Sequence, residues 1–247
     1  QETARKFARS ELMELSREME EKAMPLPDAM RKRYAEMGFL GINLPEQYGG
    51  LGLGHLEALL VLEQFAMISP AVAWPIFESA TGPVRTVEHF ASDKLKARIL
   101  PEEIKGEKIV AVSMSEPAAG TALTDLKTAA RYDGDEIVLT GQKRWCSGGG
   151  HSDYYIVYCR FDDEPGAKGI GAVLVEKERE GISFGRPESL MGFRGIPSAD
   201  IYLDEVRVSK DNLIVPKGGF GKLMTAFSLE RCGNATMGLG IAAAALE

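Results

Sequence analysis

Apolar residues in the first part of the chain recur every three or four positions, which is the spacing of an amphipathic helix. The opening stretch shows this with Phe7, Leu12, Leu15 and Met19 set among charged residues. Proline and glycine interrupt the pattern at several points, where helices end or begin. Helices are therefore predicted over residues 1–22, 28–37, 55–68, 71–90 (with breaks at Pro75 and Gly82-Pro83) and 93–104.

At residue 109 the period changes from three or four positions to two, which is the period of a β-strand. The Asp133-Gly134 pair within residues 127–145 is a strong hairpin signal. Short antiparallel strands are predicted over residues 109–115, 127–145 (two strands), 153–161, 170–177, 182–185, 199–208 and 212–215. From Gly221 the helical spacing returns. The pattern predicts an α+β fold with a helical domain at 1–108, a β domain at 109–217 and a further helix in 218–247.

The composition indicates a globular protein of one large or two modest domains. The chain has 247 residues, of which 45% are hydrophobic and 26% charged, and its net charge is −7. An acidic balance argues against a nucleic-acid binder, and the absence of a long apolar run predicts no membrane span. Three scattered cysteines (Cys146, Cys159 and Cys232) without CxxC spacing suit a reducing compartment and predict no metal site.

Both ends of the chain fall inside predicted helices, so we expect it to be part of a longer protein from which a targeting segment could be missing.

Two segments at predicted strand ends carry the candidate chemistry. "SMSEPAAGT" (113–121) offers hydroxyls and exposed backbone groups, and "GQKRWCSGGG" (141–150) adds Trp145, Ser147 and three glycines. Side by side, they would present an aromatic face and hydrogen-bonding groups to a flat heteroaromatic ring. Taken singly, Trp145 is better interpreted as a core residue, and the glycines as a phosphate loop or a tight turn. "YGGLGLG" (48–54) lacks the GxGxxG spacing of a dinucleotide loop and is interpreted as a loop between helices.

Five segments, in this order, closely resemble the acyl-CoA dehydrogenase family of flavoproteins: "LPEQYGGLGL", "SMSEPAAGT", "TGQKRWCSGGG", "MGFRGIPSADIYLDEVRV" and "FSLERCGNATMGLGIA". The resemblance covers nearly the whole chain. It implies a helical N-terminal domain, an antiparallel, β-barrel-like middle domain and a C-terminal helical bundle of which only the first helix is present here. The family usually shows "EPGAGSD" and "WITNGG", so Thr121 and Ser147 exchange one hydroxyl residue for another.

The resemblance implies non-covalent FAD as the cofactor. Met114 and Ser115 would meet the pyrimidine end of the flavin, Trp145 would cover one side of the ring, and Ser147 would approach N5. The glycines that follow would then clear space at the strand end and hold no phosphate. The full set of implied FAD contacts is Val112, Met114, Ser115, Thr121, Trp145, Cys146 and Ser147.

Glu230, in "SLERCGNA", is the candidate catalytic base. In one branch of the family the catalytic glutamate occupies this helix position, and in other branches it comes from the part of the C-terminal domain absent here. Among small and apolar residues its burial would raise its pKa, whereas a surface carboxylate is the alternative. Arg231 matches a family arginine that contacts the CoA-bearing ligand, and a surface salt bridge is its alternative. Thr121 is also implied as a substrate contact.

Trp74 and Phe77 lie three residues apart on one helical face of "SPAVAWPIFESATG". The matching helix in the family lines the deep end of the acyl cavity. Two large aromatic rings there would favour a short, branched or cyclic acyl group over a long straight one. The alternative is that both rings point into the helical core.

The resemblance implies an oxidoreductase of fatty acid metabolism that desaturates an acyl-CoA thioester. A glutamate takes the pro-R α proton, and the β hydrogen leaves as a hydride to flavin N5. The implied partners are an electron-transferring flavoprotein and further copies of the chain, in a homodimer or homotetramer. The implied location is the cytoplasm of a bacterium, or the mitochondrial matrix in a eukaryote. An acyl-CoA oxidase, reductase or desulfinase, a flavin-less scaffold and a helical interaction module are the alternatives.

Overall fold

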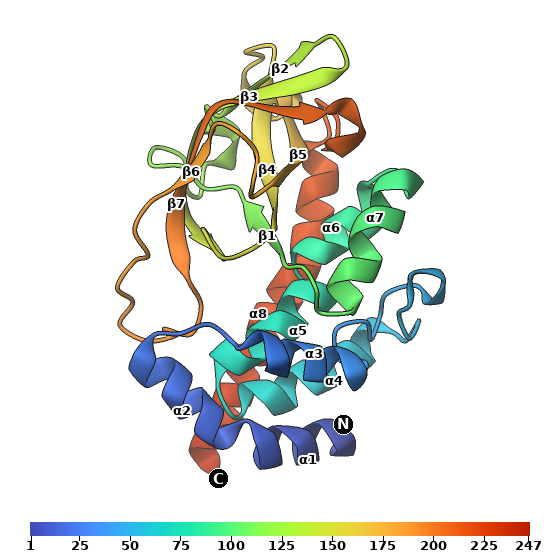
Figure 1. Ribbon diagram of the computed structural model, residues 1–247, viewed down its shortest axis with the longest axis vertical. Helices are drawn as coiled ribbons and strands as arrows, with labels where there is room; N and C mark the ends of the chain where they lie inside the picture. Colours follow the sequence, from blue (N-terminus) through green and yellow to red (C-terminus); the bar gives the residue numbers. More distant parts are fainter.

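The computed structural model describes residues 1–247, and its helices lie together below and beside one β-sheet (Figure 1). Seven α-helices precede the first strand: α1 (Glu2–Glu11), α2 (Met13–Lys22), α3 (Asp28–Glu36), α4 (His55–Ala66), α5 (Pro70–Ala80), α6 (Pro83–Phe90) and α7 (Asp93–Ile104). The eighth helix, α8 (Phe220–Leu246), follows the last strand. Four short 3₁₀ helices join these elements: η1 (Glu46–Tyr48), η2 (Leu123–Asp125), η3 (Gly166–Gly169) and η4 (Lys210–Asn212).

The helices follow the apolar spacing, with two differences, at Leu12 and at Pro75. One helix was expected over 1–22, but the structure divides it into α1 and α2 at Leu12, whose side chain is fully buried. No glycine or proline marks this bend, so the sequence carries no local signal for it. The expected break at Gly82-Pro83 is confirmed, because α5 ends at Ala80 and α6 begins at Pro83. The expected break at Pro75 is wrong, because α5 continues through this proline, which removes only one backbone N–H from the helix.

The eight strands form one sheet with the order β6-β7-β3-β2-β4-β5-β8, and β1 pairs with β4 beside this path. Their bounds are β1 (Val110–Ser113), β2 (Ala129–Asp133), β3 (Glu136–Ser147), β4 (Tyr154–Phe161), β5 (Ile170–Glu176), β6 (Ile182–Phe184), β7 (Ser198–Ser209) and β8 (Leu213–Val215). The expected hairpin at Asp133-Gly134 joins β2 to β3.

The middle sheet differs in two respects from the expected antiparallel, barrel-like arrangement. It is not closed, because no pairing joins its two end strands, β6 and β8. Two of the strand pairs, β1 with β4 and β2 with β4, are parallel. A period of two residues indicates a strand but carries no information about the direction of its neighbour, so the sequence pattern could not show this. The division at 1–108, 109–217 and 218–247 stays a prediction.

Close helix contact fixes the position of α8 against α4 and α5. Gly240 lies so near α4 that a Cβ there would be 2.7 Å from both the Cβ of Ala66 and the backbone oxygen of Glu63. Gly233 lies against Phe77 of α5 in the same way, where a Cβ would be 2.8 Å from the phenyl ring. Larger side chains at these two glycines would push α8 outward. The glycines therefore determine the position of α8, and with it the positions of its other side chains, relative to α4 and α5.

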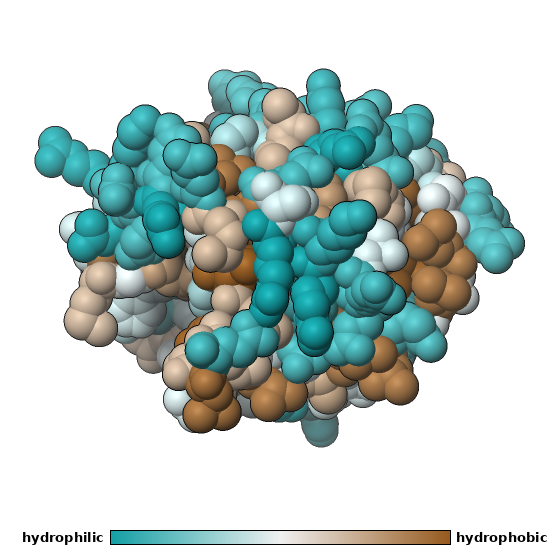
Figure 2. Space-filling view, turned by 90° about the horizontal axis from the view of Figure 1, so that it is seen from below, coloured by the Kyte–Doolittle hydropathy of each residue, from teal (hydrophilic) through white to brown (hydrophobic).

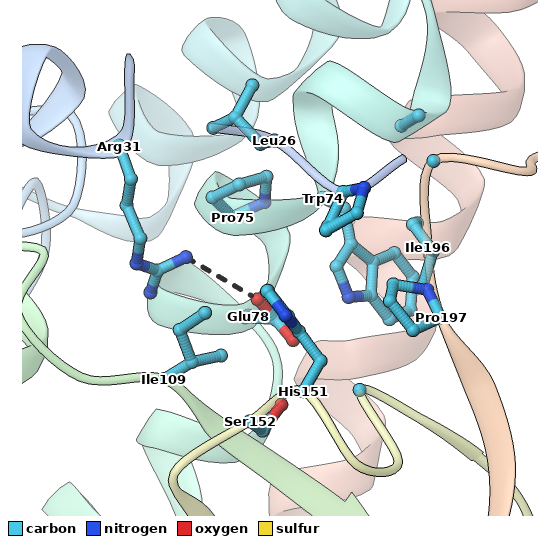
Figure 3. Close-up of a pocket in the computed structure, with 14 residues that line it drawn as sticks. Leu26, Arg31, Trp74, Pro75, Glu78, Ile109, His151, Ser152, Ile196 and Pro197 are labelled. Carbon is cyan, nitrogen blue, oxygen red and sulfur yellow. Dashed lines mark ion pairs between the residues drawn. The ribbon is translucent and has the colours of Figure 1, made fainter. Parts of the chain in front are cut away.

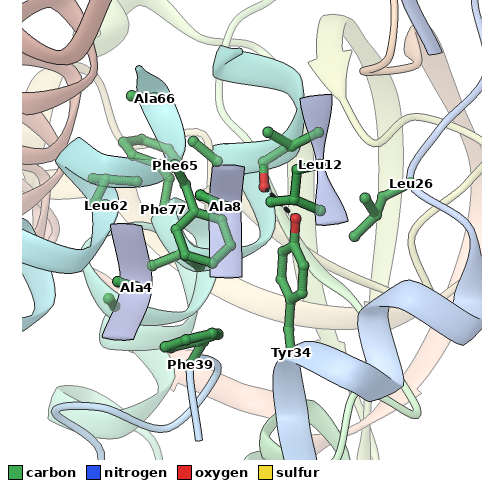
Figure 4. Close-up of a cluster of buried hydrophobic side chains, with 14 of the residues drawn as sticks. Ala4, Ala8, Leu12, Leu26, Tyr34, Phe39, Leu62, Phe65, Ala66 and Phe77 are labelled. Atoms are coloured by element: carbon green, nitrogen blue, oxygen red, sulfur yellow. Dashed lines mark hydrogen bonds between the residues drawn. The ribbon is translucent and has the colours of Figure 1, made fainter. Parts of the chain in front are cut away.

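Aromatic side chains hold the lower helices together (Figure 4). Phe7, Tyr34, Phe39 and Phe65 form edge-to-face and stacked pairs with ring centroids 5.1 to 6.5 Å apart. The buried hydroxyl of Tyr34 donates to the backbone oxygen of Val72, 3.0 Å away, so this polar atom is satisfied within the core.

Viewed from the end that carries α1 and α2, the surface mixes charged side chains with several separate apolar groups (Figure 2). None of the helices combines the length and the apolar character that crossing a membrane requires.

Candidate active site

A cavity of about 140 Å³ lies between the helices and the edge of the sheet. Its walls come from α5, the end of β1, the end of β3 and α8. Nine of the residues singled out from the sequence line it: Trp74, Phe77, Val112, Met114, Ser115, Trp145, Cys146, Ser147 and Glu230. The fold therefore brings four segments that are far apart in the sequence to one space.

The end of β1 supplies unpaired backbone donors to this cavity. β1 ends at Ser113, and the N–H groups of Met114 and Ser115 donate no hydrogen bond within the chain. Their carbonyl groups, in contrast, are both held: Lys143 Nζ donates to Met114 O at 3.1 Å, and Arg144 N donates to Ser115 O at 2.9 Å. The segment is thus anchored by its acceptors and leaves two donors for a ligand with an acceptor edge.

A bulge near the end of β3 turns Trp145 outward. The register against β7 shifts between Lys143 and Cys146, so β3 holds one extra residue there. Trp145 takes up this residue with a left-handed φ of 56°, and its side chain is 58% exposed. The interpretation of Trp145 as a core residue is therefore wrong, because the bulge displaces it from the inward-facing alternation. An exposed indole at a cavity is a surface on which a flat ring can stack.

The Gly148-Gly149-Gly150 turn does not form an anion site. Each of its three N–H groups already has a partner: Gly148 N donates to Pro197 O, Gly149 N donates to Cys146 O, and Gly150 N donates to the hydroxyl of Tyr155. Gly148 has a φ of +84°, and a Cβ there would collide with the hydroxyl of Ser152. The triplet is a tight turn, and the interpretation of it as a phosphate loop is excluded.

Cys146 and Ser147 have different surroundings although they are neighbours. The thiol of Cys146 is 3% exposed and donates to Val112 O, and burial raises its pKa to about 12. A thiol held in this way is not a nucleophile near neutral pH. Ser147 is half-buried at the last position of β3, where it pairs with Ser198 of β7.

A buried ion pair supports the β1 end from beneath, and nothing in the sequence pattern indicated it. Lys143 is 0% exposed, and its Nζ lies 2.8 Å from Glu116 Oε1. Glu116 also accepts from the backbone N–H groups of Lys127 and Thr128, at 2.6 and 2.9 Å. Burial works against ionisation of Glu116, but Lys143 and these N–H groups outweigh it and lower its pKa. The pair joins β3 to the loop that carries Met114 and Ser115.

Glu230 reaches the cavity from the middle of α8. Its side chain is half-buried, and no group in the chain donates a hydrogen bond to its carboxylate. Burial raises the pKa of Glu230 to about 7, and the neighbouring Arg231 guanidinium acts in the opposite direction. Glu230 is therefore not an ordinary surface carboxylate: it lines the cavity and titrates near neutral pH.

The structure leaves two of the expected site residues outside this cavity. Arg231 is exposed, with its guanidinium 4.6 Å from the ring centroid of Phe227 and hydrogen-bonded to Ser228 Oγ. It forms no salt bridge, so the alternative interpretation of this residue as a surface ion pair is wrong. Thr121 is exposed in the loop that follows the β1 end. Their roles as substrate contacts stay predictions.

The sequence left open whether Trp74 and Phe77 line a cavity or pack in the helical core, and the structure shows both kinds of contact. The rings of Trp74 and Phe77 stack with centroids 4.6 Å apart, and Phe77 is buried in the helical core. Trp74 is half-buried and also meets Phe193 edge-to-face at 5.4 Å. Both residues nevertheless line the cavity. Glu78, beside them on α5, lines it as well; it is the one charged residue in an apolar run, a signal that the sequence analysis passed over.

Comparisons with known proteins point to one family for the chain. Residues 1–107 match the family described as "Acyl-CoA dehydrogenase, N-terminal domain", and residues 111–206 match "Acyl-CoA dehydrogenase, middle domain". The chain is 35% identical over 246 residues to a 3-(aryl)acrylate reductase of Clostridium sporogenes, with 99% of this chain covered. It is likewise 35% identical over 246 residues to a cyclohex-1-ene-1-carbonyl-CoA dehydrogenase of Geobacter metallireducens, with 98% of this chain covered.

Among solved structures, butyryl-CoA dehydrogenase from Megasphaera elsdenii superposes with a TM-score of 0.93 at 27% identity, covering 98% of this chain and 64% of that one. This chain spans 65% of the length of the reductase and 64% of that of the cyclohexene-carbonyl-CoA dehydrogenase. Nearly all of this chain therefore matches somewhat less than two thirds of these longer proteins.

Proposed function

Because the chain belongs to the acyl-CoA dehydrogenase family, we propose that it forms the flavin- and acyl-binding part of an enzyme that desaturates an acyl-CoA thioester between its α and β carbons. One observation carries the proposal: Glu230, the exposed ring of Trp145 and the strand end with its unpaired N–H groups border the same cavity. A carboxylate that can take a proton and a surface suited to a flat cofactor thus adjoin one substrate space.

FAD is the cofactor that these residues fit, and when bound it supplies the hydride acceptor that the reaction needs. The N–H groups of Met114 and Ser115 would donate to the carbonyl edge of its ring. Trp145 would cover one face, and the hydroxyl of Ser147 would lie at the end of β3 beside it. Lys143 and Glu116 would keep this loop in place, because they hold the acceptor side of the same segment.

Glu230 is the group that we propose removes the α proton. A general base is most effective when its pKa lies near the working pH, and burial brings the pKa of Glu230 to about 7. No donor within the chain forms a hydrogen bond to the Glu230 carboxylate, so its oxygens are free to accept the α proton. The negative charge that develops on the thioester oxygen needs donors, each typically worth about 3 kcal/mol of barrier.

We expect the double substitution Trp145→Ala and Ser147→Ala to weaken FAD binding by about 30-fold or more, since loss of an aromatic side chain that a bound ligand would cover costs about 2 kcal/mol. The measurement is flavin absorbance that co-elutes with the full-length protein on gel filtration. Tyr132→Ala removes another exposed aromatic ring, from β2, which does not line the cavity, and serves as the control. Stoichiometric flavin in the double variant would show that the flavin lies elsewhere.

The acyl group is proposed to be short, branched or cyclic, because Trp74 and Phe77 fill part of the cavity on the α5 side. We expect Trp74→Ala to shift the preference toward longer straight chains, by about 0.8 kcal/mol for each methylene that the opened space buries. The measurement is kcat/KM along a straight-chain acyl-CoA series. Trp74→Phe, which keeps a ring, should retain most of the original profile. An unchanged profile in folded, flavin-loaded Trp74→Ala would mean that this ring does not limit chain length.

A reductase is the second candidate, because one relative with 35% identity is named 3-(aryl)acrylate reductase. The same cofactor and the same acid–base group could serve either direction of the reaction. Anaerobic mixing separates them: a saturated acyl-CoA should bleach the oxidised flavin if the protein is a dehydrogenase. Rapid reoxidation of the chemically reduced flavin by an unsaturated acid or its thioester, without bleaching by the saturated one, would identify a reductase.

The partners and the location of the protein are also proposals. An electron-transferring flavoprotein would reoxidise the dehydrogenase, and the protein would assemble as a homodimer or homotetramer. The cytoplasm is the proposed location, which the three scattered, free cysteines suit.

A further inference from the structure

Three buried ionisable side chains meet at the α5 wall of the cavity, one basic and two acidic. Arg31 of α3 is 4% exposed, and its Nη2 donates to Glu103 Oε1 at 2.6 Å. Its Nη1 lies 3.8 Å from Glu78 Oε2, as an ion pair without a hydrogen bond (Figure 3). One guanidinium thus faces two carboxyl groups. Burial raises the pKa of Glu78 to about 8; Glu103 also raises it, whereas Arg31 and the indole N–H of Trp74 lower it.

The two carboxyl groups differ in what they face. Glu103 is fully buried, lines neither cavity of this region and is bonded to Arg31. Glu78 makes no hydrogen bond and lines both the cavity that holds Glu230 and a smaller one of about 30 Å³. The raised pKa favours its protonated, neutral form near neutral pH. In that form the carboxyl offers a donor and an acceptor, and no hydrogen bond of ordinary length and angle within the chain satisfies them.

The surroundings of Glu78 contain further unsatisfied donors. The indole N–H of Trp74, which lines the same two cavities, makes no hydrogen bond of ordinary length and angle, although it lies near enough to the Glu78 carboxyl to act on its pKa. The smaller cavity, drawn in Figure 3, also meets the hydroxyl of Ser152 and the guanidinium of Arg31, whose Nε has no partner. A buried polar group without a partner lowers the stability of the folded protein by about 1–3 kcal/mol. An apolar residue at position 78 would avoid this loss, so the presence of Glu78 suggests that a ligand satisfies its carboxyl.

We propose that Glu78 and the indole N–H of Trp74 bind a neutral oxygen function, a hydroxyl or a carbonyl, carried by the acyl group of the substrate. This inference rests on the proposed function, since it concerns the same cavity. An anionic group is disfavoured because Arg31, the nearby cation, is already bonded to Glu103 and shared with Glu78. An ammonium group is disfavoured because it offers no acceptor to the indole N–H. A neutral oxygen can accept from both donors and, as a hydroxyl, can donate in return.

The test uses the flavin-loaded, full-length protein and a ladder of straight-chain acyl-CoAs, each ending in a methyl, a hydroxyl or a carboxylate. We expect kcat/KM for the hydroxyl form to exceed that for the methyl form by about tenfold at the chain length that reaches α5. The carboxylate form should be the poorest of the three. Glu78→Leu should remove the preference for the hydroxyl or reverse it, while Glu78→Gln, which keeps a donor and an acceptor, should retain much of it.

Glu102→Gln is the control, because it alters a carboxyl of α7 that accepts from the hydroxyl of Tyr154, does not pair with Arg31 and lines neither cavity. It should leave the ratio of hydroxyl to methyl substrates unchanged. Trp74→Phe removes the indole N–H and keeps a ring, so it should reduce the ratio even where Glu78→Leu does not fold. A wild-type preference for the methyl form at every length, or an equal ratio in Glu78→Leu and wild type, would overturn this inference alone. If no acyl-CoA of the ladder reduces the flavin, the proposed function fails together with it.

Discussion

Replacing Glu230 with glutamine should leave the protein folded and flavin-loaded but slow the reduction of its flavin by acyl-CoA by about a hundredfold or more. Glutamine keeps the size and polarity of the side chain but cannot accept the α proton. The deficit should therefore lie in the rate of flavin reduction at saturating substrate, with little change in substrate affinity. Anaerobic stopped-flow absorbance of the flavin measures both quantities.

The pH dependence of the same rate gives an independent check on Glu230. A base acts when ionised, and burial has raised the pKa of this carboxyl from an ordinary value near 4.5 to about 7. The wild-type rate should accordingly rise as the pH increases through about 7 and level off above it. In Glu230→Gln this step should disappear. Glu180→Gln, which removes an exposed carboxyl between β5 and β6, should keep both the rate and the step.

Near-normal flavin reduction in Glu230→Gln would assign the proton transfer to another group. Glu78 is the other carboxyl in this cavity, and a base from outside this chain is the remaining source. Repeating the measurement with Glu78→Gln would separate the two, because only the first would respond.

Replacing Lys143 with methionine should destabilise the protein by about 3–5 kcal/mol, since it leaves the buried carboxylate of Glu116 without its counter-charge. The same change removes the donor that holds Met114 O, so flavin affinity should fall as well. Chemical denaturation of the flavin-free protein measures the first effect, and flavin titration measures the second. Combining Lys143→Met with Glu116→Gln should restore part of the stability, because no uncompensated charge then remains.

The Arg207–Glu136 pair offers a matched control in the same sheet. It also joins β3 to a basic side chain at 2.8 Å, but both partners are about half exposed, 46% and 47%. Arg207→Met should therefore cost less than about 1 kcal/mol, because solvent screens an exposed pair. Equal losses for Lys143→Met and Arg207→Met would contradict the argument that burial makes the Lys143–Glu116 pair important.

The sequence by itself determined which segments form helices and which form strands. The apolar period, the caps and breaks at Ser69-Pro70 and Gly82-Pro83, and the hairpin at Asp133-Gly134 are all local, so they depend only on residues close together in the sequence. The motifs at the ends of β1 and β3 could also be recognised in the sequence, because strand ends with small, hydroxyl-bearing and aromatic residues differ from ordinary turns. The family of the protein followed from the order of these motifs along the chain.

The tertiary structure decided which of those residues share a site and in what state. Trp145 is exposed because of a bulge that exists only in the pairing of β3 with β7. Lys143 meets Glu116 across 27 positions of sequence, and Arg31 meets Glu78 across 47, so no periodicity could have paired them. The raised pKa values of Glu78 and Glu230 depend on which helices and strands exclude water from them. Local patterns fix the elements, but burial and pairing between distant residues exist only once the elements have packed.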